Sequence, residues 1–113
     1  MATIIKDKGE IEKIINEKIK NKKKIFTRYY DYSIAEKGLT HEEVLSILPQ
    51  FGKVTEIEEE ILKHGDIGYE LFYKLDDENY FSIATCPQKD KLLIIHAVKY
   101  RRSLDKRLKK SDT

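Results

Sequence analysis

Apolar residues recur with helical spacing near the start of the chain. Residues 8–23 carry isoleucines at intervals of i, i+3, i+4 and i+8, with Lys, Glu and Asn between them: Ile11, Ile14, Ile15 and Ile19. This spacing places one apolar stripe along an amphipathic helix. The NKKK that follows, residues 21–24, has no apolar residue and is expected to join the helix to the body. We therefore expect residues 1–24 to form an appended helix that either folds back on the domain or meets a partner.

A second helix is predicted before Gly38. The apolar pair at 25–26 indicates a short strand or an extended lead-in, and after it Tyr30, Ile34 and Lys37 share one helical face. Gly38 is suited to end this helix, because glycine adopts the left-handed backbone conformation at little cost.

The third helix has the clearest start signal in the chain. Thr40 and Glu43 have the spacing of a capping box, and Leu39 and Val44 have the spacing of a hydrophobic staple. Pro49 ends the helix, because proline cannot continue the backbone hydrogen bonds. The two helices around Gly38 then form a compact hairpin. The face expected to be buried is Val44, Leu45, Ile47 and Leu48.

The second half of the chain has the patterns of strands. Alternating apolar residues at 67–75 predict one strand, and the polar DDEN at 76–79 predicts a turn. YFSIATC at 80–86 predicts a second strand, and PQKD turns the chain into a third at 91–100. The unbroken apolar run at 92–95 is typical of a central strand that is covered on both faces.

Residues 53–64 fit either a helix or a strand. Thr55 and Glu58 imitate a second capping box, whereas Gly52 and a hairpin around HGD favour the strand, which we predict. The element order predicts an α+β fold, with N-terminal helices packed on a three- or four-stranded antiparallel sheet. One domain at 25–105 is followed by a basic C-terminal tail at 106–113.

Charge is segregated along the chain, although the formal net charge is only +2. Basic runs at 20–28 and 99–110 flank a glutamate-rich block at 56–60, so one basic and one acidic face follow if the basic runs meet in space. Cys86 is the single cysteine, which excludes an intramolecular disulfide and a thiolate cluster. No apolar run approaches the roughly 18 residues of a membrane span. We expect no membrane association and a cytoplasmic location.

Several stretches resemble the small toxins of the RelE superfamily, in its BrnT-like branch. They are FTRYYDYSIAEKGLTHEEVLSIL, the following GKV, and the ending LLIIHAVKYRRS; within the first, GLTHEE at 38–43 matches the phrase that opens a helix in that family. The resemblance covers about residues 25–105. It implies a RelE-like fold and metal-independent cleavage of RNA, without a cofactor and inhibited by a protein antitoxin.

The chain departs from the family pattern in its last strand. BrnT-type chains end that strand in I-S-A-R, whereas this chain reads IHAV, with His96 at the serine position and Val98 at the arginine position. The early helix of the family often carries a histidine, where this chain has Tyr29 and Tyr30. The missing arginine favours a non-catalytic descendant as the alternative.

Metal-free RNA cleavage needs a base for the 2′-hydroxyl, an acid for the leaving oxygen, and cations for the phosphorane charge. Alternation places His96 with Val98, Tyr100 and Arg102 on one face of the last strand, and Lys99 with Arg101 on the other. The alternative is that the histidine is half-buried and the cations are solvated. The candidate catalytic residues are His96, Lys99, Tyr100, Arg101 and Arg102.

Nucleic-acid contacts are expected from basic residues, which bind phosphate, and from tyrosines, which stack on bases or pack in a core. The histidines at 41, 64 and 96 lack metal-ligand spacing, so no metal site is predicted. The candidate nucleic-acid-binding residues are Arg28, Tyr29, Tyr30, Lys106 and Arg107.

Two functions are consistent with the sequence. The first is a RelE/BrnT-like endoribonuclease toxin that acts on RNA and is held by an antitoxin. The second is a non-catalytic module that binds nucleic acid or an acidic protein partner, as a degenerate toxin, an immunity protein or a viral accessory protein would.

Overall fold

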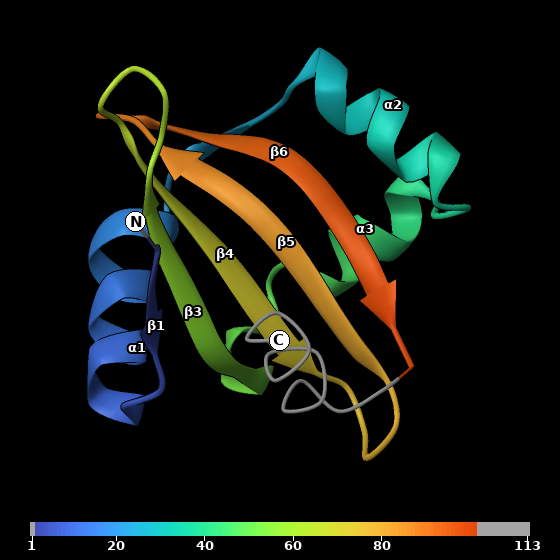
Figure 1. Cartoon of the computed structure of the whole chain (residues 1–113), viewed down its shortest axis with the longest axis horizontal. Coiled ribbons are helices and arrows are strands. Elements are labelled where there is room, and N and C mark those ends of the chain that lie inside the picture. The colour runs from blue at the N-terminus through green and yellow to red at the C-terminus, as the bar shows by residue number, and fades with distance from the viewer. Residues whose placement is uncertain (1, 102–113) are drawn as a thin grey trace.

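One six-stranded sheet organises the structure, a computed structural model that describes residues 2–101. Its order is β1-β3-β4-β5-β6-β2, and neighbouring strands are antiparallel except for β2 and β6, which are parallel (Figure 1). The strands are β1 (Ala2–Ile5), β2 (Lys23–Phe26), β3 (Val54–Ile61), β4 (Ile67–Lys74), β5 (Tyr80–Pro87) and β6 (Lys91–Tyr100).

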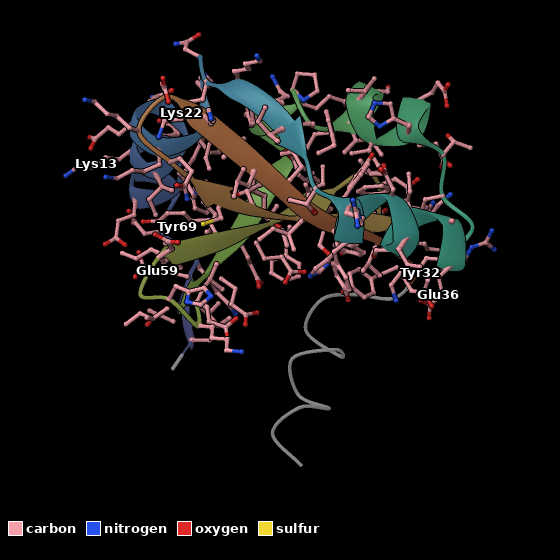
Figure 2. The ribbon with its side chains drawn as sticks, turned by 90° about the horizontal axis from the view of Figure 1, so that it is seen from above. Lys13, Lys22, Tyr32, Glu36, Glu59 and Tyr69 are labelled. Atoms are coloured by element: carbon pink, nitrogen blue, oxygen red, sulfur yellow. The ribbon has the colours of Figure 1, made fainter. Side chains whose placement is uncertain are left out.

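Within the described residues, three α-helices pack on this sheet. Seen from above, α1 and α3 lie on the same side of the sheet (Figure 2). The helices are α1 (Lys8–Ile14), which continues as a π-helical turn (Ile15–Ile19), α2 (Arg28–Glu36) and α3 (His41–Ile47), and a short 3-10 turn (Phe51–Lys53) precedes β3. The predicted α+β class and the predicted strand at 53–64 are confirmed. In the part of the chain that is described, no helix is long and apolar enough to span a membrane.

The predicted sheet of three or four strands was too small, because two short strands were missed. β1 and β2 have four residues each, too few to show an alternating pattern. Lys23 and Lys24, which we assigned to a linker, begin β2. The preceding helix was predicted to reach position 23 but ends at Ile19. Both strands are defined by partners far along the chain, β3 and β6, rather than by their own sequence.

The first helix folds back on the sheet, one of the two arrangements that the sequence left open. Its stripe is buried in the main core, with Ile11, Ile15 and Ile19 at 4%, 3% and 2% exposure. Asp7 caps the helix by accepting a hydrogen bond from the Glu10 amide at 2.9 Å. The helix therefore supplies apolar surface to the main core.

The predicted caps around α2 and α3 are confirmed. Gly38 has a φ of +71°, the left-handed conformation expected of it. The Thr40 hydroxyl accepts a hydrogen bond from the Glu43 amide at 3.2 Å, and the Glu43 carboxylate accepts one from the Thr40 amide at 3.1 Å. Leu45, predicted to be buried, is 44% exposed, because Val44 and Leu48 occupy the core-facing side of this short helix.

We predict that Thr40→Ala lowers the free energy of unfolding by about 1 kcal/mol, the usual effect of losing an N-cap side chain. Thr40→Ser retains the hydroxyl and should stay close to the parent. Urea denaturation of the three proteins, followed by circular dichroism, measures both effects. An unchanged midpoint for the alanine variant would show that this capping box adds nothing to stability.

The two faces of the sheet are distinguished by the strand register. Leu71, Ile83 and Ala97 lie opposite one another in β4, β5 and β6 and belong to the main core with the helices. The opposite face, here called the open face, includes three rows of paired residues. They are Ile4–Glu58–Glu70–Ala84–His96, Glu56–Phe72–Ser82–Val98 and Lys74–Tyr80–Tyr100.

Residues 92–95 lie in a central strand, as predicted, since β6 pairs with both β5 and β2, but the two faces of the strand are not equally covered. Leu92 and Ile94 are buried, whereas Leu93 and Ile95 are half-buried. The register of β6 against β5 shifts at this point, since Ile94 pairs with Thr85 and His96 with Ala84, which leaves Ile95 as an extra residue. Such a bulge displaces the later side chains by one position. His96, Val98 and Tyr100 share the open face, as predicted, with Lys99 on the other side.

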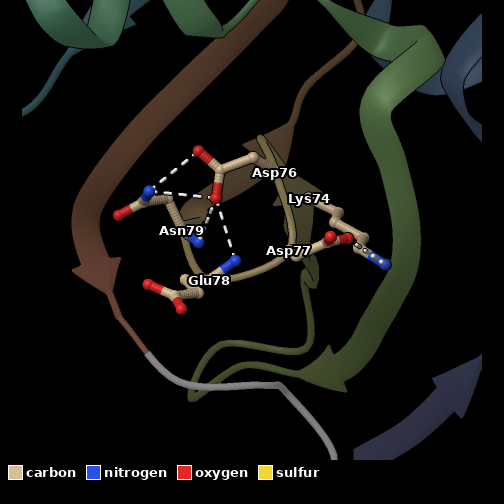
Figure 3. Close-up of polar contacts among 5 residues, drawn as sticks. All are labelled: Lys74, Asp76, Asp77, Glu78 and Asn79. Carbon is tan, nitrogen blue, oxygen red and sulfur yellow. Dashed lines mark hydrogen bonds and ion pairs between the residues drawn. The ribbon is translucent and has the colours of Figure 1, made fainter.

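A carboxylate organises the turn between β4 and β5 (Figure 3). Asp76 accepts hydrogen bonds from the amides of Glu78 and Asn79 at 2.9 and 2.8 Å, and the Asn79 side chain donates to both of its oxygens. These bonds, led by the one from the Asn79 side chain, lower the pKa of Asp76. The DDEN segment is thus a turn, as predicted, and it aligns Tyr80 with Lys74.

Candidate functional site

His96 lies at the end of an acidic row on the open face. In this row Glu58 stands opposite Glu70, Glu70 opposite Ala84, and Ala84 opposite His96. Because Ala84 is small, a hollow of about 120 Å³ remains between the larger side chains, with Glu60 and Gly68 also on its wall. Its wall is therefore rich in carboxylates, which repel the phosphates of RNA.

The structure brings Tyr29 next to His96, although the two are far apart in the sequence. Tyr29 projects from the first turn of α2, which packs against β6, and its ring lies 6.3 Å from the imidazole, edge to face at 82°. Tyr29 is 59% exposed and His96 is half-buried. Together they offer a phenol and an imidazole at one border of the open face, two groups that can exchange protons with a ligand.

The other candidate catalytic residues do not gather around this pair. Lys99 stands opposite Phe81, whose ring is in the main core, and so lies on the other face of β6 from His96. Tyr100 packs with Phe72 and Tyr80 in a second apolar cluster. Arg101 is exposed at the end of the described chain. The remaining candidates, Arg102, Lys106 and Arg107, lie outside the described residues.

Tyr30 is part of the core and has no exposed ring that could stack on a base. It is 0% exposed, and its hydroxyl lies 2.8 Å from Nδ1 of His41. The Phe26 ring contacts both, with centroids 4.9 Å from Tyr30 and 4.6 Å from His41. Burial raises the pKa of Tyr30 to about 12, and the nearby charges of Asp31 and Glu42 act in the same direction. This tyrosine–histidine pair could not be predicted from the sequence, because it depends on how α2 and α3 pack.

Buried tyrosines should make the fold sensitive to alkali. Burial raises the pKa of Tyr30 and Tyr69 to about 12, with a hydrogen bond to Glu59 adding to the effect at Tyr69, and it raises the pKa of Tyr73 as well. Unfolded tyrosines ionise near pH 10, so this contribution to stability is complete below about pH 10 and is lost as the pH rises through about 12.

We predict that part of the tyrosinate absorbance appears only with alkaline unfolding. A titration followed by ultraviolet absorbance and circular dichroism measures both events. Reversible ionisation of all seven tyrosines near pH 10 in the folded protein would contradict the prediction.

The basic run at 20–28 forms one wall of a second depression, here called the β2 groove. Lys20, Asn21 and Lys24 line a surface groove of about 480 Å³ together with Phe51. The Lys20 ammonium lies 5.6 Å from the centre of the Phe51 ring. Lys20 and Lys24 are exposed and Phe51 is half-buried. Cations and an aromatic ring therefore share one open groove.

Further lysines lie at the same edge of the sheet, because β2 pairs with the start of β6. Lys23 stands opposite Lys91, and Lys89 is exposed in the turn before it. The Lys22 ammonium donates a hydrogen bond to the Gln88 carbonyl at 2.6 Å, which ties the two segments together. The basic run at 20–28 thus lies beside the beginning of β6 and not beside the basic run that starts at residue 99. Arg28 is exposed at the start of α2, beyond the end of β2.

Sequence reasoning missed Phe51, Lys89 and Lys91 as members of a basic surface. The lysines were visible in the sequence, but only the parallel pairing of β2 and β6 brings them to residues 20–24. Comparison with protein-family models, curated proteins and solved structures gives no match to this chain. The resemblance to RelE-type toxins accordingly stays a prediction.

Proposed function

We propose that the protein is a nucleic-acid-binding module, and that it binds single-stranded RNA in the β2 groove. The observation behind this proposal is that Lys20, Lys24 and Phe51 line one groove, with the Lys20 ammonium over the Phe51 ring. Proteins that bind single strands combine a basic groove for the backbone with aromatic rings on which bases stack. The groove offers both kinds of contact within a few residues.

Charge supports the same assignment. Lysines at 20, 22, 23, 24, 89 and 91 lie at this edge of the sheet, with Asp90 as the acidic residue among them. Each phosphate that a lysine neutralises releases counterions, so affinity should fall steeply with salt. Lysines also protect an exposed edge strand from pairing with other chains, and β2 is such a strand. The Phe51 ring beside these lysines favours nucleic-acid binding over protection of the edge strand as their only role.

A second proposal retains the toxin-type activity, metal-independent cleavage of RNA. The observation that favours it is the contact between Tyr29 and His96, which supplies a proton acceptor and a proton donor at one place. In this proposal His96 takes the 2′-hydroxyl proton and Tyr29 protonates the leaving oxygen. Stabilisation of the phosphorane falls to Arg102, which alternation predicts on the same face of the last strand as His96. The carboxylates around His96 oppose phosphate, so we rank cleavage below binding.

One experiment separates the two proposals. Binding of the parent protein to a single-stranded RNA and to a hairpin RNA is measured across a salt series, and the same RNAs are examined for cleavage in the presence of a chelator. Binding tighter than about 10⁻⁴ M that weakens with salt, with intact RNA, supports the binding module. Cleavage that His96→Ala abolishes supports the toxin-type enzyme. Absence of binding at low salt contradicts both.

A further inference from the structure

A second groove continues the β2 groove along the first helix. This depression, here called the α1 groove, has a volume of about 250 Å³. Lys20, Phe51 and Gly52 line both grooves, which therefore meet at the contact between Lys20 and the Phe51 ring. A Cβ added at Gly52 would meet no atom within 4 Å, so the junction is open at this residue. Buried apolar residues also line the α1 groove: Ile11, Ile15 and Val54.

The helix borders the α1 groove with polar side chains spaced four residues apart. Lys8, Glu12 and Asn16 line the groove at i, i+4 and i+8, and all three are exposed. Residues with this spacing lie on one side of a helix. Lys20 extends the row by four more positions and reaches the ring of Phe51. The row therefore leads from the α1 groove to the beginning of the β2 groove.

The π-helical turn accounts for the position of Lys20 in this row. Residues four apart drift around an α-helix, because one turn takes about 3.6 residues. The turn at 15–19 is wider, since the Lys20 amide donates a hydrogen bond to the Ile15 carbonyl at 2.8 Å, five residues back. The additional residue offsets the drift and keeps Lys20 beside the groove. Such turns are rare and occur frequently at functional sites.

The polar groups of the α1 groove suit a base better than a phosphate. The Glu12 carboxylate repels phosphate, but its two oxygens can accept hydrogen bonds from two neighbouring donors. Among the RNA bases, guanine has two adjacent donors on its Watson–Crick edge, the N1–H and the 2-amino group. The O6 acceptor beside them suits the amide donor of Asn16. Glu12 and Asn16 together therefore complement the edge of guanine.

We propose that the α1 groove binds one guanine base of the RNA strand that the β2 groove holds. Glu12 accepts hydrogen bonds from the N1–H and the 2-amino group, and the Asn16 amide donates one to O6. Ile11 and Ile15 supply apolar surface for the flat face of the base, and Lys20 neutralises the adjoining phosphate. This inference rests on the proposed function and adds a base preference to it.

A free guanine nucleotide carries the same base as the strand. The strand is favoured because the cations continue from Lys20 to Lys24 in the β2 groove, where a mononucleotide has no second phosphate to offer. Guanosine monophosphate should therefore displace a bound RNA only at concentrations far above the Kd of that RNA. Displacement at comparable concentrations would show that a free nucleotide is the ligand and would overturn the assignment to a strand.

RNAs that differ at a single position test the base preference with the full chain. Fluorescence anisotropy at low salt compares a uridine octamer with octamers that carry one G, A, C or inosine in the middle. We expect the octamer with G to bind about 10-fold more tightly than those with U, A or C, a usual effect of a bidentate base contact. Inosine lacks the 2-amino group and should lose most of this gain. Equal affinity for inosine and G would overturn the two hydrogen bonds to Glu12.

Two matched variants assign the preference to the α1 groove. Glu12→Gln leaves one acceptor in place of two and should reduce the preference for G from about 10-fold to about three-fold or less. Glu17→Gln changes the net charge equally at an exposed position of the same helical segment and should keep the preference. A full preference in Glu12→Gln, or an equal loss in both variants, would overturn the assignment.

The same measurements separate this inference from the proposed function. Equal affinity of the parent for all five octamers, with binding that still weakens with salt, would overturn the guanine site and leave the β2 groove as a site for any single strand. Absence of binding by every octamer at low salt would overturn both.

Discussion

Replacement of Ile15 by alanine should destabilise the protein by about 2–5 kcal/mol, as loss of a large buried aliphatic side chain usually does. Ile15 is the first residue of the π-helical turn that continues α1. Its side chain is 3% exposed and lies within the main core. A cavity would remain there, because the surrounding strands hold their positions through the sheet. Urea denaturation measured by circular dichroism gives the change in the free energy of unfolding.

Leu45→Ala is the matched control for this variant. Leu45 is 44% exposed on α3, so its truncation should change stability by no more than about 0.5 kcal/mol. A large loss at Ile15 with a small one at Leu45 would establish that the first helix is integral to the fold. Equal, small effects would instead mean that this helix is dispensable for the stability of the sheet.

The double substitution Lys20→Glu and Lys24→Glu should weaken binding of single-stranded RNA by about 100-fold at low salt. The change removes two phosphate partners from the β2 groove and places two carboxylates there. Each lost phosphate contact should reduce the slope of log affinity against log salt by about 0.7 for a single strand, about 1.4 for both. Fluorescence anisotropy with a labelled RNA across a salt series measures affinity and slope together.

The control for this variant changes the net charge by the same amount at a distance from the groove. Lys37 is exposed at the end of α2, and Lys63 is exposed in the turn between β3 and β4. Lys37→Glu with Lys63→Glu should lower affinity only slightly, through the long-range charge of the protein. If both double variants weaken binding equally, the RNA responds to net charge and the β2 groove is not its site.

Elements whose stabilising contacts join residues close together in the sequence were predictable from the sequence. Thr40 and Glu43 are three positions apart, and Gly38 follows directly on its helix, so their interactions are contained in a short stretch. The strands β4, β5 and β6 follow one another through short turns and show their own apolar patterns. β1 and β2 were missed because four residues show no period, and their strand character comes from partners distant in the sequence.

The same distinction applies to the candidate site. The sequence singled out His96 and Tyr29 as candidates, and the structure places their rings together. The sequence could not indicate that Glu58 and Glu70 lie in the same row of the sheet as His96. That row depends on the registers of four strand pairs and on the bulge at Ile95. Tyr30 was a candidate for stacking, and its burial follows from the packing of α2 against α3 and β6. Side-chain surroundings of this kind arise from tertiary structure, which local patterns do not determine.

The strand order has a consequence for how the protein is made on the ribosome. Both outer strands come from the first 26 residues, but β1 needs β3 as its neighbour and β2 needs β6. Synthesis proceeds at roughly 5–20 residues per second, so the edge strands wait for several seconds while the central hairpins are still being translated. A nascent chain that has reached β5 would still hold KKIF without a neighbour. Closure of the sheet is therefore expected to be a late step, because β2 acquires its neighbour only after β6 has been translated.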